Sequence, residues 1–271
     1  MHVVVIHGWK EETTELVQAL AVTLGITAYE MRQRMIGGGP AVVTTFADPE
    51  KARTMAAKLN QSGVAALVID VDEVRGNTGR FVVRRFELKE RSLRIEASDG
   101  QSAEIAYEDI DLLLPGTRIR GQSETKTVTE RKFSLGRTIL TGGIPLTKKV
   151  EHQEEVSTEE RENILCLYAG ERPPVVFSQS GLSYDGLGAD MKVSRELNFA
   201  YLKSELRRLC PAAGYDDRLL NRLGQVRILG PAQNPETNLD IAFHILARSL
   251  RRGRLTDKSD KGIRTLSGTE I

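Results

Sequence analysis

Short β-branched runs alternate with helical apolar stripes through residues 2–72, and this alternation constrains the fold more than any other feature. The β-branched runs are too short for helices and are expected to form strands at 2–7, 41–46 and 64–71. Helices are expected at about 12–24, at 28–36, and between Asp48 and Gly63. The chain therefore begins with a βααβαβ module, and its class is α+β.

Two patterns mark helix boundaries in this module. Asp48 before Pro49 is typical of a helix start, because Asp caps the helix and Pro fits its first position. Gly37-Gly38-Gly39-Pro40 is typical of a helix end, because glycine adopts the left-handed cap and proline prevents continuation. The same four residues could be read as a phosphate loop. Phosphate loops lead from a strand into a helix, whereas this segment leads from a helix into a strand, so a helix end is favoured.

The markers Leu24-Gly25, Gly39-Pro40, Glu50 to Leu59 and Gly63 occur in the order found in two known domains. Residues 2–72, about a quarter of the chain, resemble the C-terminal domain of the bacterial ribosomal stalk protein and the Clp protease adaptor. These markers are mostly turn and core positions, so the resemblance implies a fold more than a function. The residues that would identify the partner differ here. The lysine-rich stalk helix is replaced by Tyr29-Glu30-Met31-Arg32-Gln33-Arg34, and the adaptor's Asn-Asp pair by Gly8-Trp9-Lys10.

After a turn-rich linker at 73–79 the pattern becomes mainly β. Strands are expected at 81–88, 92–97, 103–106, 111–119, 163–168 and 174–178, with a hairpin turn at Ser98-Asp99-Gly100. Ser157-x-x-Glu160 leaves open a helix start before 163–168. A helix capped by Ser194 should span 194–209. This order predicts a β-rich domain, a small barrel or bent sheet, closed by an amphipathic helix, and it resembles a pleckstrin-homology-type fold.

The C-terminal part predicts a smaller helical segment. One helix should start at Asp216 and another at Asn234-Pro235-Glu236. Beyond residue 252 the chain is polar and without pattern, which predicts disorder. The expected domains are 1–73, 80–210 with a basic insertion at 121–150, 211–252, and a disordered tail at 253–271.

Residue types that carry chemistry are sparse and scattered. The four histidines have no metal-ligand neighbour at helical spacing, and Cys166 and Cys210 form no Cys-x-x-Cys pair. The segment Tyr184 to Asp190 lacks the alternating oxygen ligands of a calcium loop and reads as a glycine-rich turn. We therefore predict no catalytic residue, metal or cofactor. Two cysteines, no signal peptide and no membrane-length apolar run predict a cytoplasmic protein.

Charge is segregated along the chain although its net value is only +1. Residues 118–150 have a balance of +6, residues 151–162 of −5, and residues 248–264 of +5. Such blocks are usually solvated faces. Alternatively, the insertion at 121–150 binds an anionic partner. The candidate binding residues are Arg118, Arg120, Lys126, Arg131, Lys132, Arg137, Lys148 and Lys149.

Three functions remain open at this stage. The favoured one is a non-enzymatic protein-binding or adaptor protein. The second is a nucleic-acid or ribosome-associated protein that uses the basic segments 118–150 and 248–264. The third is an enzyme with an unrecognised site. The sequence predicts no specific partner and no oligomeric state.

Overall fold

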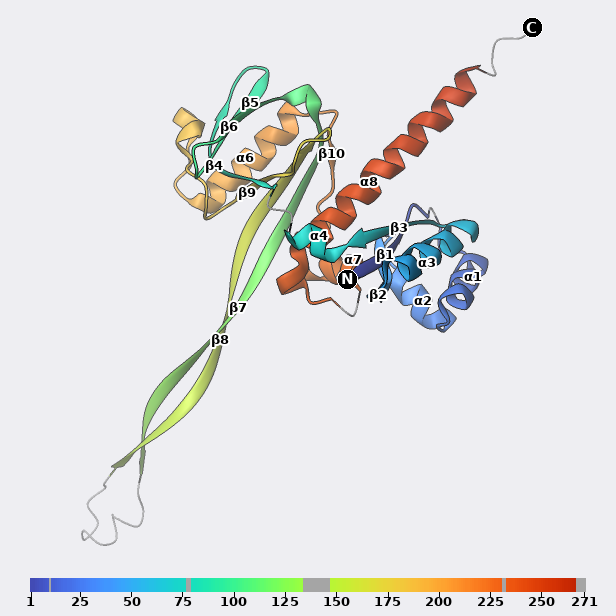
Figure 1. Cartoon of the computed structure of the whole chain (residues 1–271). Helices are drawn as coiled ribbons and strands as arrows, with labels where there is room; N and C mark the ends of the chain where they lie inside the picture. Colours follow the sequence, from blue (N-terminus) through green and yellow to red (C-terminus); the bar gives the residue numbers. More distant parts are fainter. Residues whose placement is uncertain (10, 77–78, 134–146, 231–232, 267–271) are drawn as a thin grey trace. The chain divides into compact units, whose positions relative to one another are not determined.

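The computed structural model describes residues 1–271 except 10, 77–78, 134–146, 231–232 and 267–271, and it describes no side chain at 120–133, 147–159 and 254–266 (Figure 1). The chain is α+β, as expected from its sequence. It divides into two compact units. One comprises Met1–Arg118 and Glu162–Ile271, and the other is Ile119–Arg161.

The first module contains the six predicted elements in the predicted order. They are β1 (His2–His7), α1 (Thr14–Leu24), α2 (Ala28–Met35), β2 (Ala41–Phe46), α3 (Pro49–Gln61) and β3 (Ala65–Asp70). The strands form an antiparallel sheet in the order β2-β1-β3. Alternate residues of β1 enter different cores. Val4 and Ile6 pack with α1, α2 and α3, whereas Val3 and Val5 belong to a second core on the other face.

Side-chain caps explain where these helices begin. Asp48 accepts a hydrogen bond from the Glu50 amide at 2.8 Å, and Pro49 occupies the first turn of α3, so this predicted start is confirmed. Thr27 and Glu30 form a reciprocal capping box at the start of α2. The predicted end of α2 is confirmed as well. Gly37, Gly38 and Gly39 all have positive φ, and the Gly39–Pro40 peptide bond is cis.

The segment predicted as a linker is partly helical. Helix α4 (Val71–Gly76) follows β3 directly. Asp70 accepts hydrogen bonds from the amides of Asp72 and Glu73, which caps the first turn, while Val71 and Val74 are buried. The linker prediction was therefore wrong for residues 73–76. The Asp70 cap and the burial of Val71 and Val74 stabilise a helix here despite the nearby glycines.

The second sheet has seven strands in the order β10-β7-β8-β9-β4-β5-β6. They are β4 (Phe81–Leu88), β5 (Ser92–Ala97), β6 (Ser102–Ala106), β7 (Ile110–Phe133), β8 (Thr147–Ala169), β9 (Val175–Ser178) and β10 (Gly214–Tyr215). Short 3₁₀ helices η1 (Tyr107–Asp109) and η2 (Asp185–Asp190) lie between strands or before the next helix. Over the described residues the strands β10 and β6 are the two edges of the sheet and do not pair with each other. Of the two predicted architectures, the sheet is therefore confirmed and the closed barrel is wrong.

Helix α6 (Arg195–Leu209) packs on the second sheet, as predicted. Ser194 caps it by accepting from the Leu197 amide at 3.3 Å. Phe199, Leu202 and Leu206 are buried in one core with side chains of β4, β8 and β9. Phe86 of β4 meets Phe177 of β9 edge to face, with ring centroids 6.5 Å apart.

The strands β7 and β8 are far longer than expected. Most of the predicted insertion at 121–150 belongs to them, and only 134–146 lies outside the described residues. Ser157 and Glu160 lie within β8, so the alternative of a helix start there is wrong. Frequent threonine and valine favour strands here even though apolar residues are few.

Two helices complete the chain, α7 (Arg222–Leu229) and α8 (Pro235–Leu266). The predicted start at Asp216 was wrong, because α7 begins after Asn221, which accepts from the Gly224 amide at 2.8 Å. The start of α8 after Asn234 is confirmed. Helix α8 continues to Leu266, through most of the segment 253–271 for which the sequence predicts a disordered tail. No proline interrupts that segment.

A single core joins the first sheet to the C-terminal helices. It contains Val3 and Val5 of β1, Ile228 of α7, and Phe243 and Leu246 of α8, together with side chains of β7 and β8. This core contains residues from both sides of the boundaries expected at 73 and 210. Among the described residues, no helix is long and apolar enough to cross a membrane.

Candidate functional site

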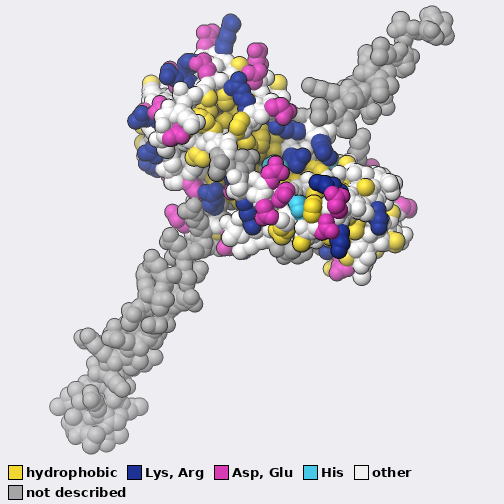
Figure 2. Space-filling model, in the orientation of Figure 1, with side chains coloured by type: hydrophobic (Ala, Val, Ile, Leu, Met, Phe, Trp, Pro, Cys, Tyr) yellow, Lys and Arg dark blue, Asp and Glu magenta, His cyan; other side chains and the backbone are white. Residues whose placement is uncertain are grey.

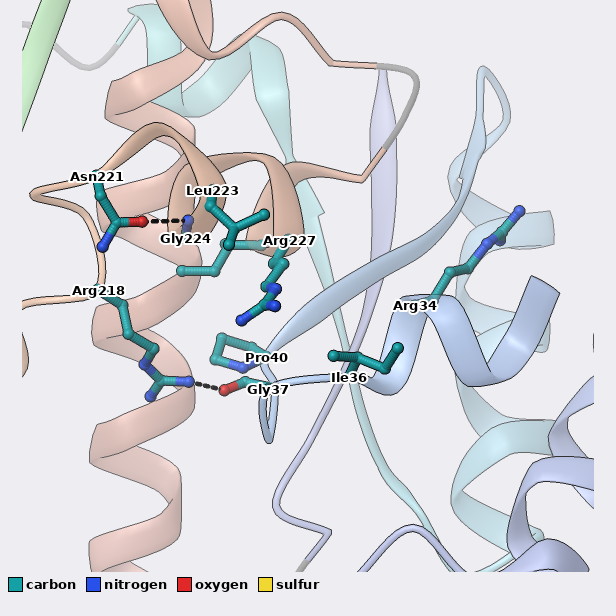
Figure 3. Close-up of a pocket in the computed structure, with 11 residues that line it drawn as sticks. Arg34, Ile36, Gly37, Pro40, Arg218, Asn221, Leu223, Gly224 and Arg227 are labelled. Atoms are coloured by element: carbon teal, nitrogen blue, oxygen red, sulfur yellow. Dashed lines mark hydrogen bonds between the residues drawn. The ribbon is translucent and has the colours of Figure 1, made fainter. Parts of the chain in front are cut away.

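A cavity of about 150 Å³ opens between the end of α2 and the first turns of α7 (Figure 3). Segments that are far apart in the sequence build it: the Gly37–Pro40 turn on one side and Arg218 to Ile228 on the other. Its lining residues are Arg34, Ile36, Gly37, Gly39, Pro40, Arg218, Asn221, Leu223, Gly224, Arg227 and Ile228. The lining includes three arginines and no carboxylate, so the cavity is suited to an anion.

Glycine is required on both walls. Gly39 has φ +53°, and a Cβ there would lie 2.2 Å from the Trp9 ring. A Cβ at Gly224 would lie 1.9 Å from the carbonyl oxygen of Arg218. Gly39 thus lets the turn pack against Trp9, and Gly224 lets α7 approach the segment at Arg218.

Arg218 is held in place by its own protein. Its guanidinium donates to both carboxylate oxygens of Asp216, with distances of 2.7 to 3.0 Å. It also donates to the carbonyl oxygen of Gly39 (Figure 3). Because its charge is matched by Asp216, Arg218 mainly fixes the turn against the segment before α7.

Arg227, in contrast to Arg218, is not held by a carboxylate within the described residues. Its exposed side chain points from α7 toward the Gly37–Pro40 turn (Figure 3). A Cβ at Gly37 would lie 3.0 Å from its Nη1 atom, so the guanidinium lies against that glycine. Within the described part of the chain, Arg227 has no hydrogen bond and no ion pair. It is an uncompensated cation at the cavity.

Arg34 contributes less to the charge of the cavity. Its guanidinium donates to the carbonyl oxygen of Val43 and points away from the Gly37–Pro40 turn (Figure 3). Of the three lining arginines, Arg227 is the one that points toward the turn and has no hydrogen bond within the described residues.

Apolar side chains surround this cation. On α7, Leu223 is 59% exposed and Val226 is 39% exposed, and Leu223 also lines the cavity. Ile36 and Pro40 line the opposite wall. Such a mixture of one arginine and exposed apolar side chains is typical of protein-binding surfaces.

The basic residues selected from the sequence lie elsewhere. Arg118 makes ion pairs with Glu162 at 3.5 Å and Asp240 at 3.8 Å. Arg120, Lys126, Arg131, Lys132, Lys148 and Lys149 belong to β7 or β8, and their side chains are outside the description; Arg137 lies outside the described residues. The predicted binding surface therefore lies outside the described side chains, except for Arg118.

The two strands that carry these residues are neighbours in the sheet. The glutamates of 151–162 belong to β8, the strand next to β7 in the sheet. Over residues 118–162 the sequence has nine basic and eight acidic side chains, a net charge of +1. Elsewhere, over the described surface that Figure 2 shows, basic and acidic side chains are interspersed.

The second basic segment, 248–264, is partly described. Arg251 makes an ion pair with Asp111 at 2.5 Å and donates to the carbonyl oxygen of Gly170 at 2.7 Å. Its guanidinium also lies 5.4 Å from the centre of the Tyr168 ring. This arginine stabilises the fold and is not free for a partner.

Groups that could act in catalysis are buried in uncharged form. Burial raises the pKa of Cys166 to about 12 and lowers the pKa of His244 to about 4, with Arg248 and Arg80 adding to the second effect. Burial also raises the pKa of Tyr168. Among the described residues, no group of three His, Cys, Asp or Glu side chains could hold a metal. Cys166 and Tyr168 belong to the core, and His244 is half-buried on α8.

Sequence reasoning selected one wall of the cavity and missed the other. The Gly37–Pro40 turn was weighed as a phosphate loop and interpreted as a helix end, and it is a helix end. Its opposing residues, Arg218 and Arg227, follow no motif, because the first is 179 residues from Gly39. Comparison of the chain with protein-family models, curated proteins and solved structures finds no match.

Proposed function

We propose that this chain is a non-enzymatic adaptor that binds another protein at the exposed face of α7. The observation that carries the proposal is the unpaired Arg227, flanked by the exposed Leu223 and Val226. Arginine and apolar side chains supply much of the binding energy at protein interfaces. The resemblance of residues 2–72 to the stalk domain and the Clp adaptor supports the same class of function, since both bind proteins.

An enzymatic role has less support. A catalytic site needs a nucleophile, acid or base whose pKa suits the reaction and whose position allows contact with a substrate. Cys166 and Tyr168 are buried and His244 is half-buried, and their pKa values favour the neutral form near pH 7. We therefore favour binding over chemistry.

A nucleic-acid or ribosome-associated role is the alternative. It would use segments 118–150 and 248–264, but the two arginines that the structure describes in ion pairs, Arg118 and Arg251, are matched by carboxylates. The near-neutral charge of 118–162 also weakens attraction to phosphate. We propose a cytoplasmic location, because the two cysteines are buried and unpaired and fit a reducing compartment.

Affinity capture with the full chain tests the proposal. The bait is compared with Leu223→Ser/Val226→Ser and with Val193→Ser, a control whose side chain is 97% exposed but does not line the cavity. We expect specific proteins that persist through nuclease and high salt, are lost with the double variant and are kept with the control. Capture that disappears with nuclease would support the nucleic-acid alternative and contradict the adaptor.

A further inference from the structure

We infer that the Arg227 cavity binds a carboxylate group, presented by an acidic residue with apolar neighbours in a partner protein. This inference rests on the proposed adaptor function and adds the chemistry of the bound segment. Arg227 would be the ligand-contacting residue, and Arg218 a positioning residue that acts through the Gly39 turn.

The charge balance of the cavity indicates a single negative charge. The charge of Arg218 is matched by Asp216, and the charged Arg34 points away from the Gly37–Pro40 turn and donates to the carbonyl oxygen of Val43. Arg227 points toward that turn and has no ion pair within the described residues. Its planar fork of N–H donors matches the two oxygens of a carboxylate.

The size of the cavity indicates a small group. A volume of about 150 Å³ holds a carboxyl group and a few waters, since a water occupies roughly 30 Å³ in the liquid. It is below the roughly 300–1,000 Å³ of pockets that enclose a small-molecule ligand. The end of an Asp or Glu side chain fits this space, while the rest of the ligand remains outside.

The surroundings of Arg227 indicate apolar neighbours for that acid. Ile36 and Pro40 line one wall, and Leu223 lines the other. A segment that places its carboxylate on Arg227 would bring adjacent residues against these side chains. No aromatic side chain lines the cavity, so it offers no stacking platform for a base, and RNA is the less favoured ligand.

The test is an NMR titration of the full chain, following the side-chain Nε–Hε signals of its arginines. The probe is an acetylated and amidated Leu-Glu-Leu peptide, compared with Leu-Gln-Leu, Leu-phosphoserine-Leu and a short single-stranded RNA, all at constant ionic strength. The signal lost in Arg227→Gln identifies the residue. We expect the glutamate peptide to shift this signal with saturation, and the glutamine peptide to leave it in place.

Variants separate recognition from general electrostatics. Arg227→Gln should weaken binding of the glutamate peptide about ten-fold or more, because a charge-assisted bidentate pair is lost. Arg227→Lys keeps the positive charge but lacks the planar pair of N–H donors. Its affinity for the glutamate peptide should lie between those of wild type and Arg227→Gln. Arg207→Gln, which removes a cation stacked on Tyr215 outside the cavity, should bind like wild type.

Each outcome bears on the inference. Equal shifts with the glutamate and glutamine peptides, no shift at Arg227, or tighter binding of phosphoserine or RNA would each overturn it. The adaptor function is judged separately by capture. If Arg227→Gln still captures partners that Leu223→Ser/Val226→Ser does not, the adaptor function is supported and the carboxylate site is contradicted. If the peptide binds but no partner is captured, the carboxylate site is supported and the adaptor function is contradicted.

Discussion

The basic strand β7 and the Arg227 cavity offer two kinds of positive charge. The first is prominent in the sequence, with eight basic residues between 118 and 150, yet its neighbour β8 carries the glutamates of 151–162. The second has few basic residues, but one of them has no partner within the described chain. The comparison teaches that charge density along a sequence does not measure the attraction that a surface exerts. What matters is which charges the fold leaves uncompensated.

The largest expected effect tests how the cavity is built. Gly224→Ala places a Cβ 1.9 Å from the Arg218 carbonyl oxygen, and the backbone must shift. We expect a loss of about 3 kcal/mol in the free energy of unfolding, from overpacking of a tight contact. Urea denaturation measures it.

The control for this change is Gly76→Ala, where a Cβ would meet nothing within 4 Å. That variant should change stability by less than about 0.5 kcal/mol. Equal effects at both glycines would contradict the close approach of α7 to the Arg218 segment.

A smaller loss is expected from Arg218→Ala. The variant removes the ion pair with Asp216 and the hydrogen bond to Gly39, both partly exposed. The expected loss is about 1–2 kcal/mol in the free energy of unfolding. Arg222→Ala, whose ion pair with Glu236 is longer at 3.5 Å, should lose about 0.5 kcal/mol or less. The reverse order would show that Arg218 does not hold the turn.

Acid should weaken the core that joins the two sheets. The folded pKa of His244 is lowered from 6.5 to about 4, so the unfolded chain binds more protons in that range. Its contribution to stability is present above pH 6.5 and lost as the pH falls toward 4. His244→Gln should therefore flatten the pH dependence of the unfolding midpoint between these values. An unchanged slope would contradict a neutral, buried His244, and binding at the cavity is best compared above this range.

The smallest effect is expected in the strand pair. Since residues 118–162 carry a net charge of only +1, binding to an RNA homopolymer should be weak and should depend little on salt. Lys126→Gln/Arg131→Gln/Lys132→Gln should alter it by less than about three-fold. Filter binding at several salt concentrations checks this. A steep loss with salt that the triple variant removes would mean that the basic strand is a functional surface.

Local rules predicted much of the fold. The strands at 2–7 and 41–46 have the predicted bounds, and Asp48 and Ser194 cap helices as expected. Each of these features depends on neighbouring residues. The error at Asp216 has a local cause that the capping rule does not include, because Arg218, two residues further on, engages that carboxylate and the helix begins after Asn221.

The site could not be predicted in the same way. Arg218 and Arg227 reach the Gly37–Pro40 turn only because a shared core packs α7 against the first sheet. No spacing in the sequence encodes that contact. Likewise, the basic segment 118–150 and the acidic segment 151–162 are two separate blocks in the sequence. Only the strand order shows that β7 and β8, which carry most of them, are neighbours in the sheet.

The most direct test of the central claim sets the two regions against each other in one titration. The glutamate peptide is added to wild type, to Arg227→Gln and to Lys126→Gln/Arg131→Gln/Lys132→Gln, and peptide affinity is measured from amide shifts of α7. We expect the single change at Arg227 to reduce affinity about ten-fold or more, and the triple change on β7 to leave it within about two-fold. The opposite pattern, with affinity lost through the triple change and kept without Arg227, would contradict the account.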